Sequence, residues 1–297
     1  MGAAVARCRG GPLAHSSAAG HVSVMQRALR RVLAAVALAS VPAAAGAATG
    51  IALDYEVRYG PLAVLEVHST TRLDGGRYET TSEMRTVGVI GLLFPWSAGS
   101  RTAGSGRGVD LAPLTHRSHG EFRGVDRTVA IDYAAGGNVA ARVEPSADSD
   151  ERDAVPADLQ QATIDPLTAG LAAVASGCSG RLRVFDGRRR YDMVLADQGE
   201  VEVPSRAAIY QGVARRCRVT IAPLAGFWRR STREDERATH IDAWIAAPRP
   251  DLMPVPVYLE LSAPRGTLGI HLSAARVLDA DERTENTEPR INNDEHR

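Results

Sequence analysis

Lysine is absent from this 297-residue chain, and all 35 of its basic residues are arginine. Without lysine, the chain cannot form a lysine Schiff base, use lysine as a general base or hold phosphate with a Walker-type lysine. The formal net charge is +0, so no overall electrostatic field favours nucleic acid as a partner.

Recognisable enzyme motifs are missing as well. The chain has no Gly-x-Ser-x-Gly elbow, no His-Glu-x-x-His and no phosphate loop. His116 and His119 lie three residues apart, but on a strand that spacing directs them to opposite faces, and no third ligand is nearby in sequence. We therefore expect a non-enzymatic protein without metal or cofactor. A hydrolase whose residues meet only in space is the alternative.

The N-terminal region has the pattern of a secretion signal. Arg27, Arg30 and Arg31 precede the apolar run 32–41, and Ala45-Gly46-Ala47 offers a small-residue cleavage site. The run is about half the ~20 residues that span a bilayer. We expect a signal peptide from Met25 to Ala47, cleaved before Ala48, and a periplasmic protein that is not integral to the membrane. A retained anchor is the alternative, and the sequence leaves open whether translation starts at Met1 or Met25.

Cysteine is rare, with three residues in the whole chain. Cys8 lies in the segment that we expect to be removed, which leaves Cys178 and Cys217 in an oxidising compartment. Parity and compartment together predict a disulfide between them. Two buried free thiols are the alternative.

Alternation of apolar and polar residues with a period of two dominates the rest of the chain and predicts many short strands. The first clear pair is 51–59 and 62–73, and Asp74-Gly75-Gly76 then predicts a tight turn. Glycine-rich residues 99–108 are expected to form a connection. Further strands are expected at 77–85, 114–122, 127–133, 139–144, 182–185, 191–195, 201–203, 208–220, 240–246, 255–262 and 268–277.

One helix interrupts this pattern. Apolar residues recur at helical spacing from Leu159 to Val174, Asp165-Pro166 suits the first turn of a helix, and Gly177 ends it. The expected fold is mainly β: a strongly curved antiparallel sheet or open β-barrel with one central helix. We expect residues 1–47 to be an upstream extension plus signal peptide, 48–279 a single domain and 280–297 a disordered polar tail. A two-domain split at residues 145–158 is the alternative.

Several segments resemble the DUF3108 family of exported bacterial proteins. They are Tyr55 to Gly60, Gly91-Leu92-Leu93-Phe94-Pro95, Asp165-Pro166-Leu167-Thr168, the stretch from Gly177 to Asp192, and Cys217 with Gly226-Phe227. The resemblance covers roughly residues 50 to 277. It implies a curved β protein similar in outline to periplasmic carriers of lipoproteins, and it transfers no catalytic residue.

Two groups of residues are candidates for ligand binding. The apolar segment 87–96 suits a lid over a hydrophobic cavity with Phe94 and Trp96 as anchors, and plain core packing is the alternative. Arg188, Arg190 and Arg216 suit a cationic patch for phosphate or carboxylate. Their alternative is a solvated face paired with carboxylates such as Asp192 and Glu234.

Asp186-Gly187 is typical of a hairpin turn rather than of a catalytic carboxylate.

Taken together, these patterns predict a protein that binds an apolar or amphiphilic envelope ligand, such as a lipid or acyl group. The alternative is a scaffold that supports envelope integrity, or a protein-interaction module for envelope proteins, with a filled core and no ligand.

Overall fold

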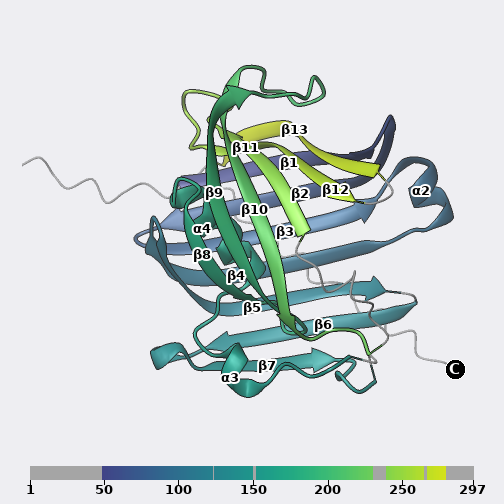
Figure 1. The fold of residues 1–297 in the computed structure, drawn as a ribbon, viewed down its shortest axis with the longest axis vertical. Helices are drawn as coiled ribbons and strands as arrows, with labels where there is room; N and C mark the ends of the chain where they lie inside the picture. Colours follow the sequence, from purple (N-terminus) through teal and green to yellow (C-terminus); the bar gives the residue numbers. More distant parts are fainter. Residues whose placement is uncertain (1–48, 123, 150–151, 230–238, 264–265, 279–297) are drawn as a thin grey trace, which may run out of the picture. The chain divides into compact units, whose positions relative to one another are not determined.

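The structure is a computed structural model that describes residues 49–122, 124–149, 152–229, 239–263 and 266–278 (Figure 1). The expected signal peptide and the expected polar tail lie outside these residues, as does Glu234.

In these described residues, thirteen strands form one curved, open antiparallel sheet. The same ranges contain three short helices and one 3-10 turn between strands: α2 (Gly88–Leu93), η1 (Ala135–Gly137), α3 (Ala157–Gln160) and α4 (Pro166–Ala175). The strands are β1 (Thr49–Tyr59), β2 (Leu62–Asp74), β3 (Arg77–Thr86), β4 (Ser97–Arg107), β5 (Asp110–Phe122), β6 (Val125–Tyr133), β7 (Val139–Glu144), β8 (Gly180–Phe185), β9 (Arg190–Glu202), β10 (Val213–Ala225), β11 (Thr239–Ala246), β12 (Val255–Ala263) and β13 (Gly266–Leu278).

The strand order divides the sheet into two runs of consecutive neighbours. It reads β7-β6-β5-β4-β3-β2-β1-β13-β12-β11-β10-β9-β8, so β1 and β13 join the two runs in the middle. Strands from both sides of residues 145–158 therefore lie in one sheet. In Figure 1, β9, β10 and β11 cross in front of β3, β4 and β5, with α4 between them.

The expected alternation is visible in β1. Ile51, Tyr55 and Val57 are buried, whereas Asp54, Glu56 and Arg58 between them are partly exposed. The turn predicted at residues 74–76 joins β2 to β3. Gly75 and Gly76 both have positive φ there (55° and 86°), a conformation that glycine adopts without steric cost.

The expectation of a connection at residues 99–108 was wrong, because this segment is β4, inside the sheet. Its glycines are needed for close packing. A Cβ on Gly99 would lie 2.4 Å from the imidazole of His119, and one on Gly104 would lie 2.5 Å from the Tyr78 ring. Glycine here makes room for the large side chains of neighbouring strands.

Three boundaries also differ from expectation. The strands expected at 191–195 and 201–203 are one strand, β9, and the strand expected from residue 208 begins at Val213. The helical region is split into α3 and α4, because Ala162 adopts positive φ (52°) and Ile164 pairs with Val184 as an isolated bridge. α4 begins at Pro166, where the Asp165-Pro166 signal placed it.

The helix α4 lies between the two runs of strands and contacts both. Near its start, Thr168 and Asp165 are buried against β3 and β4. Near its end, Ala173 belongs to an apolar cluster with Leu195 of β9 and Val219 of β10. We call the face of the sheet that α4 contacts the inner face.

Candidate functional site

Two rows of polar side chains cross the inner face of β2 to β5, and we call them the hydroxyl wall. Strand register places them side by side: Thr71, Thr80, Thr102 and His116 in one row, and Ser69, Ser82, Ser100 and Ser118 in the next. The first row is buried, and three serines of the second row are half-buried. Buried faces of sheets are usually apolar, so a concentration of buried hydroxyl groups is an unusual feature that points to a functional surface.

The hydroxyl wall is only partly satisfied by its own hydrogen bonds. The hydroxyls of Thr71 and Thr80 lie 3.2 Å apart, and Ser69 Oγ donates to the carbonyl of Thr81 at 2.9 Å. Among the described residues, the side chains of Ser82, Ser100 and Ser118 have no hydrogen-bond partner. These three hydroxyls are available to another polar group.

The inner face of β9 to β13 is chemically opposite, and we call it the aliphatic wall. Register again sets the rows: Leu195, Val219, Ile241, Leu261 and Leu268 in one, and Cys217, Ala243, Leu259 and Ile270 in the next. Ile221 and Met193 form a further pair. The side chains near β9 and β10 are mostly buried, but Ile241, Leu259 and Leu261 remain half-buried. Apolar surface on the inner face is therefore left partly uncovered.

A buried polar network attaches α4 to the hydroxyl wall. Asp165 caps the helix by accepting from the backbone N–H groups of Leu167 and Thr168, at 3.0 and 3.1 Å. It also accepts from the hydroxyls of Thr168 (2.6 Å) and Thr102 (2.7 Å). His116 Nδ1 lies 2.8 Å from Thr102 Oγ1 and 3.4 Å from an Asp165 oxygen.

The same partners control the ionisation of Asp165. Burial by itself would raise the pKa of its carboxyl group, but the hydrogen bond and charge from His116 and the two threonine hydroxyls outweigh burial and lower it. The hydroxyl groups of Tyr78 and Thr168 are hydrogen-bonded, with their oxygens 2.7 Å apart. Burial raises the pKa of Tyr78 to about 12. The Asp-Pro-Leu-Thr motif is thus a helix cap that is bonded into the sheet.

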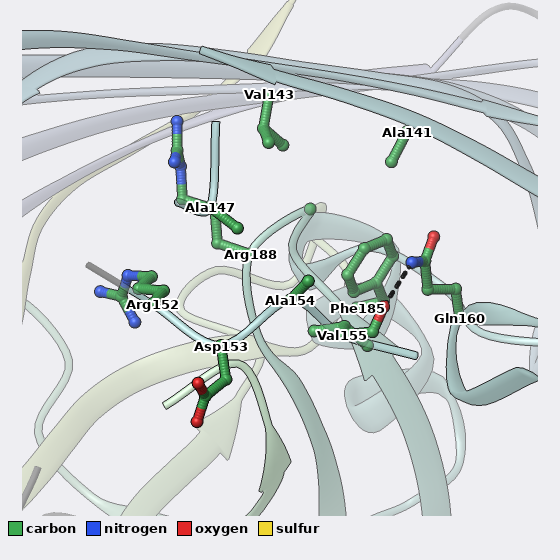
Figure 2. A pocket seen from close by; sticks show the side chains of 11 residues that line it. Ala141, Val143, Ala147, Arg152, Asp153, Ala154, Val155, Gln160, Phe185 and Arg188 are labelled. Carbon is green, nitrogen blue, oxygen red and sulfur yellow. Dashed lines mark hydrogen bonds between the residues drawn. The ribbon is translucent and has the colours of Figure 1, made fainter. Parts of the chain in front are cut away.

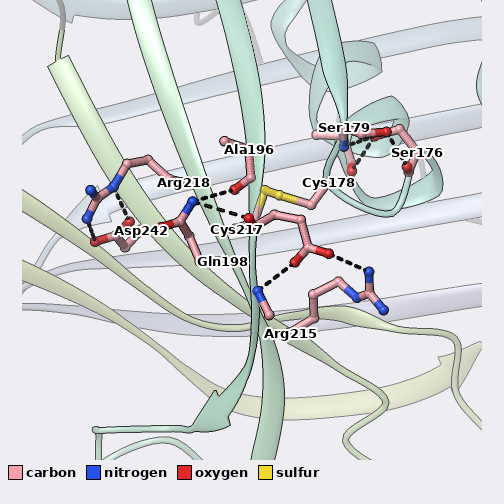
Figure 3. The surroundings of a disulfide bond; sticks show 12 residues. Ser176, Cys178, Ser179, Ala196, Gln198, Arg215, Cys217, Arg218 and Asp242 are labelled. Carbon is pink, nitrogen blue, oxygen red and sulfur yellow. Dashed lines mark hydrogen bonds and ion pairs between the residues drawn. A yellow bond between two sulfur atoms is a disulfide. The ribbon is translucent and has the colours of Figure 1, made fainter.

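A disulfide attaches the other end of α4 to the aliphatic wall. Cys178 and Cys217 are bonded, with their Cα atoms 5.6 Å apart, which confirms the predicted pair (Figure 3). Cys178 has positive φ (69°) just after the helix and is fully buried. The alternative of two free thiols was wrong.

The three arginines proposed as ligands each bind groups of the protein itself. Arg188 donates to the carbonyls of Pro145 and Glu144, and Arg190, which is 3% exposed, pairs with Asp192 at 2.8 Å. Arg216 pairs with Asp242 at 2.7 Å.

These arginines also do not form one patch. Arg190 lies opposite Ala225 in β10, nine residues from Arg216 along that strand. At ~3.3 Å per residue, the two positions are roughly 30 Å apart. Pairing with carboxylates, as expected in the alternative, accounts for Arg190 and Arg216.

Asp186 has the turn role that its sequence context indicated. Its carboxylate accepts from the backbone N–H groups of Arg188 (2.9 Å) and Arg189 (2.7 Å), and its own N–H donates to the carbonyl of Arg189. These bonds close the turn between β8 and β9. The turn also sets the position from which Arg188 reaches Pro145.

Phe94 and Trp96 lie at another part of the sheet, between α2 and β4. Phe94 is 68% exposed, so it is packed neither as a lid nor in the core. Trp96 is half-buried, and its indole N–H donates to the carbonyl of Glu121. None of the residues of α2 is buried.

One small pocket lies beside β7, and the sequence did not indicate it. It has a volume of about 130 Å³ and is lined mainly by apolar groups, among them Val143, Val155 and Phe185, with Arg152 and Arg188 at its side (Figure 2). Both arginines donate to backbone carbonyls. The pocket is therefore an apolar hollow next to arginines that stabilise the fold.

Two further features were considered in the sequence, a metal site and a membrane-spanning segment, and the described part of the chain bears on both. No group of three or more His, Cys, Asp or Glu residues there is placed to hold a metal ion. No helix within the described ranges is long and apolar enough to cross a membrane.

Comparison with known proteins gives a family and a distant structural likeness. The family described as "Protein of unknown function (DUF3108)" matches residues 54–273. No curated protein matches the chain. A crystal structure of a beta-barrel-like protein of the domain of unknown function DUF1849 from Brucella abortus is similar at 11% identity and a TM-score of 0.43, covering 78% of this chain and 98% of that one.

Proposed function

This chain belongs to the DUF3108 family, a family of unknown function, and from its inner face we propose that it is an exported, non-enzymatic protein that binds an amphiphile. The observation that carries the proposal is the pairing of two unlike walls around α4. An acyl chain fits the aliphatic wall, and a polar head group fits the hydroxyl wall.

The exposure of the aliphatic wall supports an apolar ligand. Ile241, Leu259 and Leu261 are half-buried although they lie on the inner face. Covering apolar surface is favourable by about 25 cal/mol per Å², so an acyl chain that completes their burial gains binding free energy from each side chain.

The unpaired serine hydroxyls support a polar group at the other end of the ligand. Ser82, Ser100 and Ser118 offer donors and acceptors without fixed charge. Arg190 and Arg216 add no free charge, because each is already paired with a carboxylate. We therefore expect a neutral or zwitterionic head group, bound with little dependence on salt concentration.

Export rests on the N-terminal pattern of arginines, apolar run and Ala45-Gly46-Ala47. N-terminal sequencing of the protein recovered from the periplasm should start at or near Ala48. Recovery of a membrane-bound chain that keeps residues 32–41 would contradict the periplasmic assignment.

Two variants of one strand test the amphiphile. Ile221 is half-buried on the inner face of β10, whereas Leu224 on the same strand is 47% exposed. Replacing Ile221 with Gln should lower retention of lipid in native mass spectrometry of protein purified from the periplasm of its own host. Leu224→Gln removes a similar side chain and should leave retention unchanged.

Equal lipid content in both variants would contradict binding at the aliphatic wall. If the native protein carries no lipid and takes up no lysophospholipid, the scaffold interpretation is favoured instead. Turnover of an added ester by the purified protein would contradict the non-enzymatic part of the proposal.

A further inference from the structure

An uncharged apolar projection lies at one end of the sheet, away from α4. It consists of α2 and the residue after it, which extend beyond the end of β3 in Figure 1. Four of its side chains are largely exposed: Val89 (64%), Leu92 (84%), Leu93 (64%) and Phe94 (68%). We call these four residues the apolar tip.

The apolar tip is held in place by a defined set of hydrogen bonds. Thr86 N–H donates to the carbonyl of Trp96, and Thr86 Oγ1 accepts from the N–H of Trp96 and donates to the carbonyl of Phe94, all at 2.9 Å. Gly91 packs so closely that a Cβ would lie 2.8 Å from the carbonyl oxygen of Thr86. These contacts hold the backbone that carries the exposed side chains, so little backbone conformational entropy is lost when the side chains are covered.

Neighbouring residues extend the apolar surface. The N–H of Val87 donates to the carbonyl of Val64 in β2, which places α2 beside the turn between β1 and β2. At that turn, Leu62 is 54% exposed and Tyr59 is 43% exposed. The apolar tip and this turn therefore lie at the same end of the sheet.

Charge is absent from the whole segment. Residues 86–97 contain no acidic or basic side chain, and Arg85, which precedes them, is paired with Glu66 at 2.7 Å. From Val87 to Pro95 no side chain carries a hydrogen-bonding group. Within this segment, the surface thus offers apolar contact without charged or hydrogen-bonding side chains.

The size of the apolar tip helps to decide whether a second protein or a membrane covers it. Side chains of this kind expose on the order of 150–200 Å² when free, so the four residues of the apolar tip offer roughly 500 Å² in total. A stable protein interface buries about 800 Å² on each partner. The apolar tip is too small for a stable dimer, yet it is as large as the apolar patches that mark functional surfaces on monomers.

From this size, the position of α2 beyond the end of β3 and the lack of charge, we propose that the apolar tip inserts into the interface of a lipid bilayer and docks the protein on a membrane surface. Hydrocarbon needs no directional partner, so an uncharged projection with Trp96 and Tyr59 at its base suits this environment. The inference is independent of whether the inner face holds a ligand.

Vesicle binding tests this docking directly. Protein purified from the periplasm would be sedimented with vesicles of dioleoylphosphatidylcholine, and its partition compared with that of the double variant Leu92→Ser/Phe94→Ser. Because two large apolar side chains are removed, partition should fall on the order of 100-fold. Added salt should change the native partition by less than twofold, since no charge takes part.

A matched control uses apolar residues outside the apolar tip. Val109 (54% exposed) lies in the turn between β4 and β5 at the opposite end of β4, and Leu114 (52% exposed) lies on β5. The double variant Val109→Ser/Leu114→Ser should bind vesicles as the native protein does. In addition, brominated lipids should quench native fluorescence, and Trp96→Phe should remove most of that quenching.

Three outcomes would overturn the proposal. One is equal vesicle binding by the native protein and the Leu92→Ser/Phe94→Ser variant, and another is binding that the control variant loses to the same extent. The third is no binding to vesicles together with a stable dimer, seen by sedimentation, that Leu92→Ser/Phe94→Ser abolishes. All variants should first be shown to be folded. The four serine substitutions lie at exposed positions, so we expect them to keep the native thermal midpoint, and the midpoint of Trp96→Phe is measured separately because Trp96 is half-buried.

Discussion

The hydroxyl wall of β2 to β5 and the aliphatic wall of β9 to β13 have the same backbone architecture and opposite chemistry. Both are antiparallel runs of consecutive strands. One carries Thr80, Thr102 and Ser82 at inner positions where the other carries Val219, Ile241 and Leu259. The same sheet thus has a polar inner surface on one run of strands and an apolar inner surface on the other. Hydrogen bonds of Asp165 and Thr168 attach α4 to the polar surface, and the Cys178–Cys217 disulfide attaches its other end to the apolar surface.

The largest expected effect comes from cutting the polar attachment. Asp165→Ala removes the helix cap and leaves Thr102, Thr168 and His116 without their shared acceptor in a buried place. Loss of one partner from a buried charged network costs about 3 to 5 kcal/mol. The free energy of unfolding from urea denaturation should fall by that amount, and a change below about 1 kcal/mol would mean that α4 is not held through this network.

Cutting the covalent attachment should have a slightly smaller effect. Cys178 and Cys217 are separated by 39 residues, and closing a loop of that size stabilises a fold by about 3 to 4 kcal/mol in the chain-entropy model. Cys178→Ala/Cys217→Ala should lower the free energy of unfolding accordingly. The native protein measured in reductant is the control and should match the variant. Two reactive thiols in the denatured, unreduced protein would show that no bridge forms.

The two halves should also respond to acid at different pH. Asp165, in the polar network, has a lowered pKa, whereas His271 on β13 has a pKa lowered first by burial and then by Arg58. In each case the unfolded state binds the proton more readily, so stability is present above the ordinary pKa and is lost as the pH falls through the folded one.

The ordinary values are ~6.5 for histidine and ~3.9 for aspartate, which sets the order of the two losses. Stability should first decline below about pH 6.5 through His271 and decline again below about pH 4 through Asp165. His271→Gln should remove the first decline, and Asp165→Asn the second. Urea denaturation at several pH values measures both, and a single decline that neither variant alters would contradict the assignment.

Sequence alone predicted the strands well where alternation was regular, and it predicted the cysteine pair from parity. It failed at β4, because glycine is depleted in strands and the side chains that fill the space above Gly99 and Gly104 come from β5 and β3. Strand β4 is specified by its neighbours more than by its own residues.

The candidate site was harder to predict than the fold. Arginines in sequence do not show which carboxylate or carbonyl they will reach, and the internal partners of Arg188 and Arg216 become visible only in the fold. The hydroxyl wall was missed because its rows depend on strand register. Repeated Ser and Thr at alternate positions, as in Ser69 and Thr71 or Ser100 and Thr102, were the available signal.

The pairing of β1 with β13 joins strands from opposite ends of the described chain, and this affects the order in which the sheet can fold. Every other neighbouring pair of strands in the described sheet is consecutive in sequence, whereas Ile51 pairs with Val277 across most of the chain. Each run can therefore assemble from local hairpins, while the central seam waits for the last strand and closes at the greatest loop entropy. A chain permuted to begin before α3 and end after β7, with β13 linked to β1, would keep α4 and contain the same sheet as one uninterrupted meander, and it should fold without that delay.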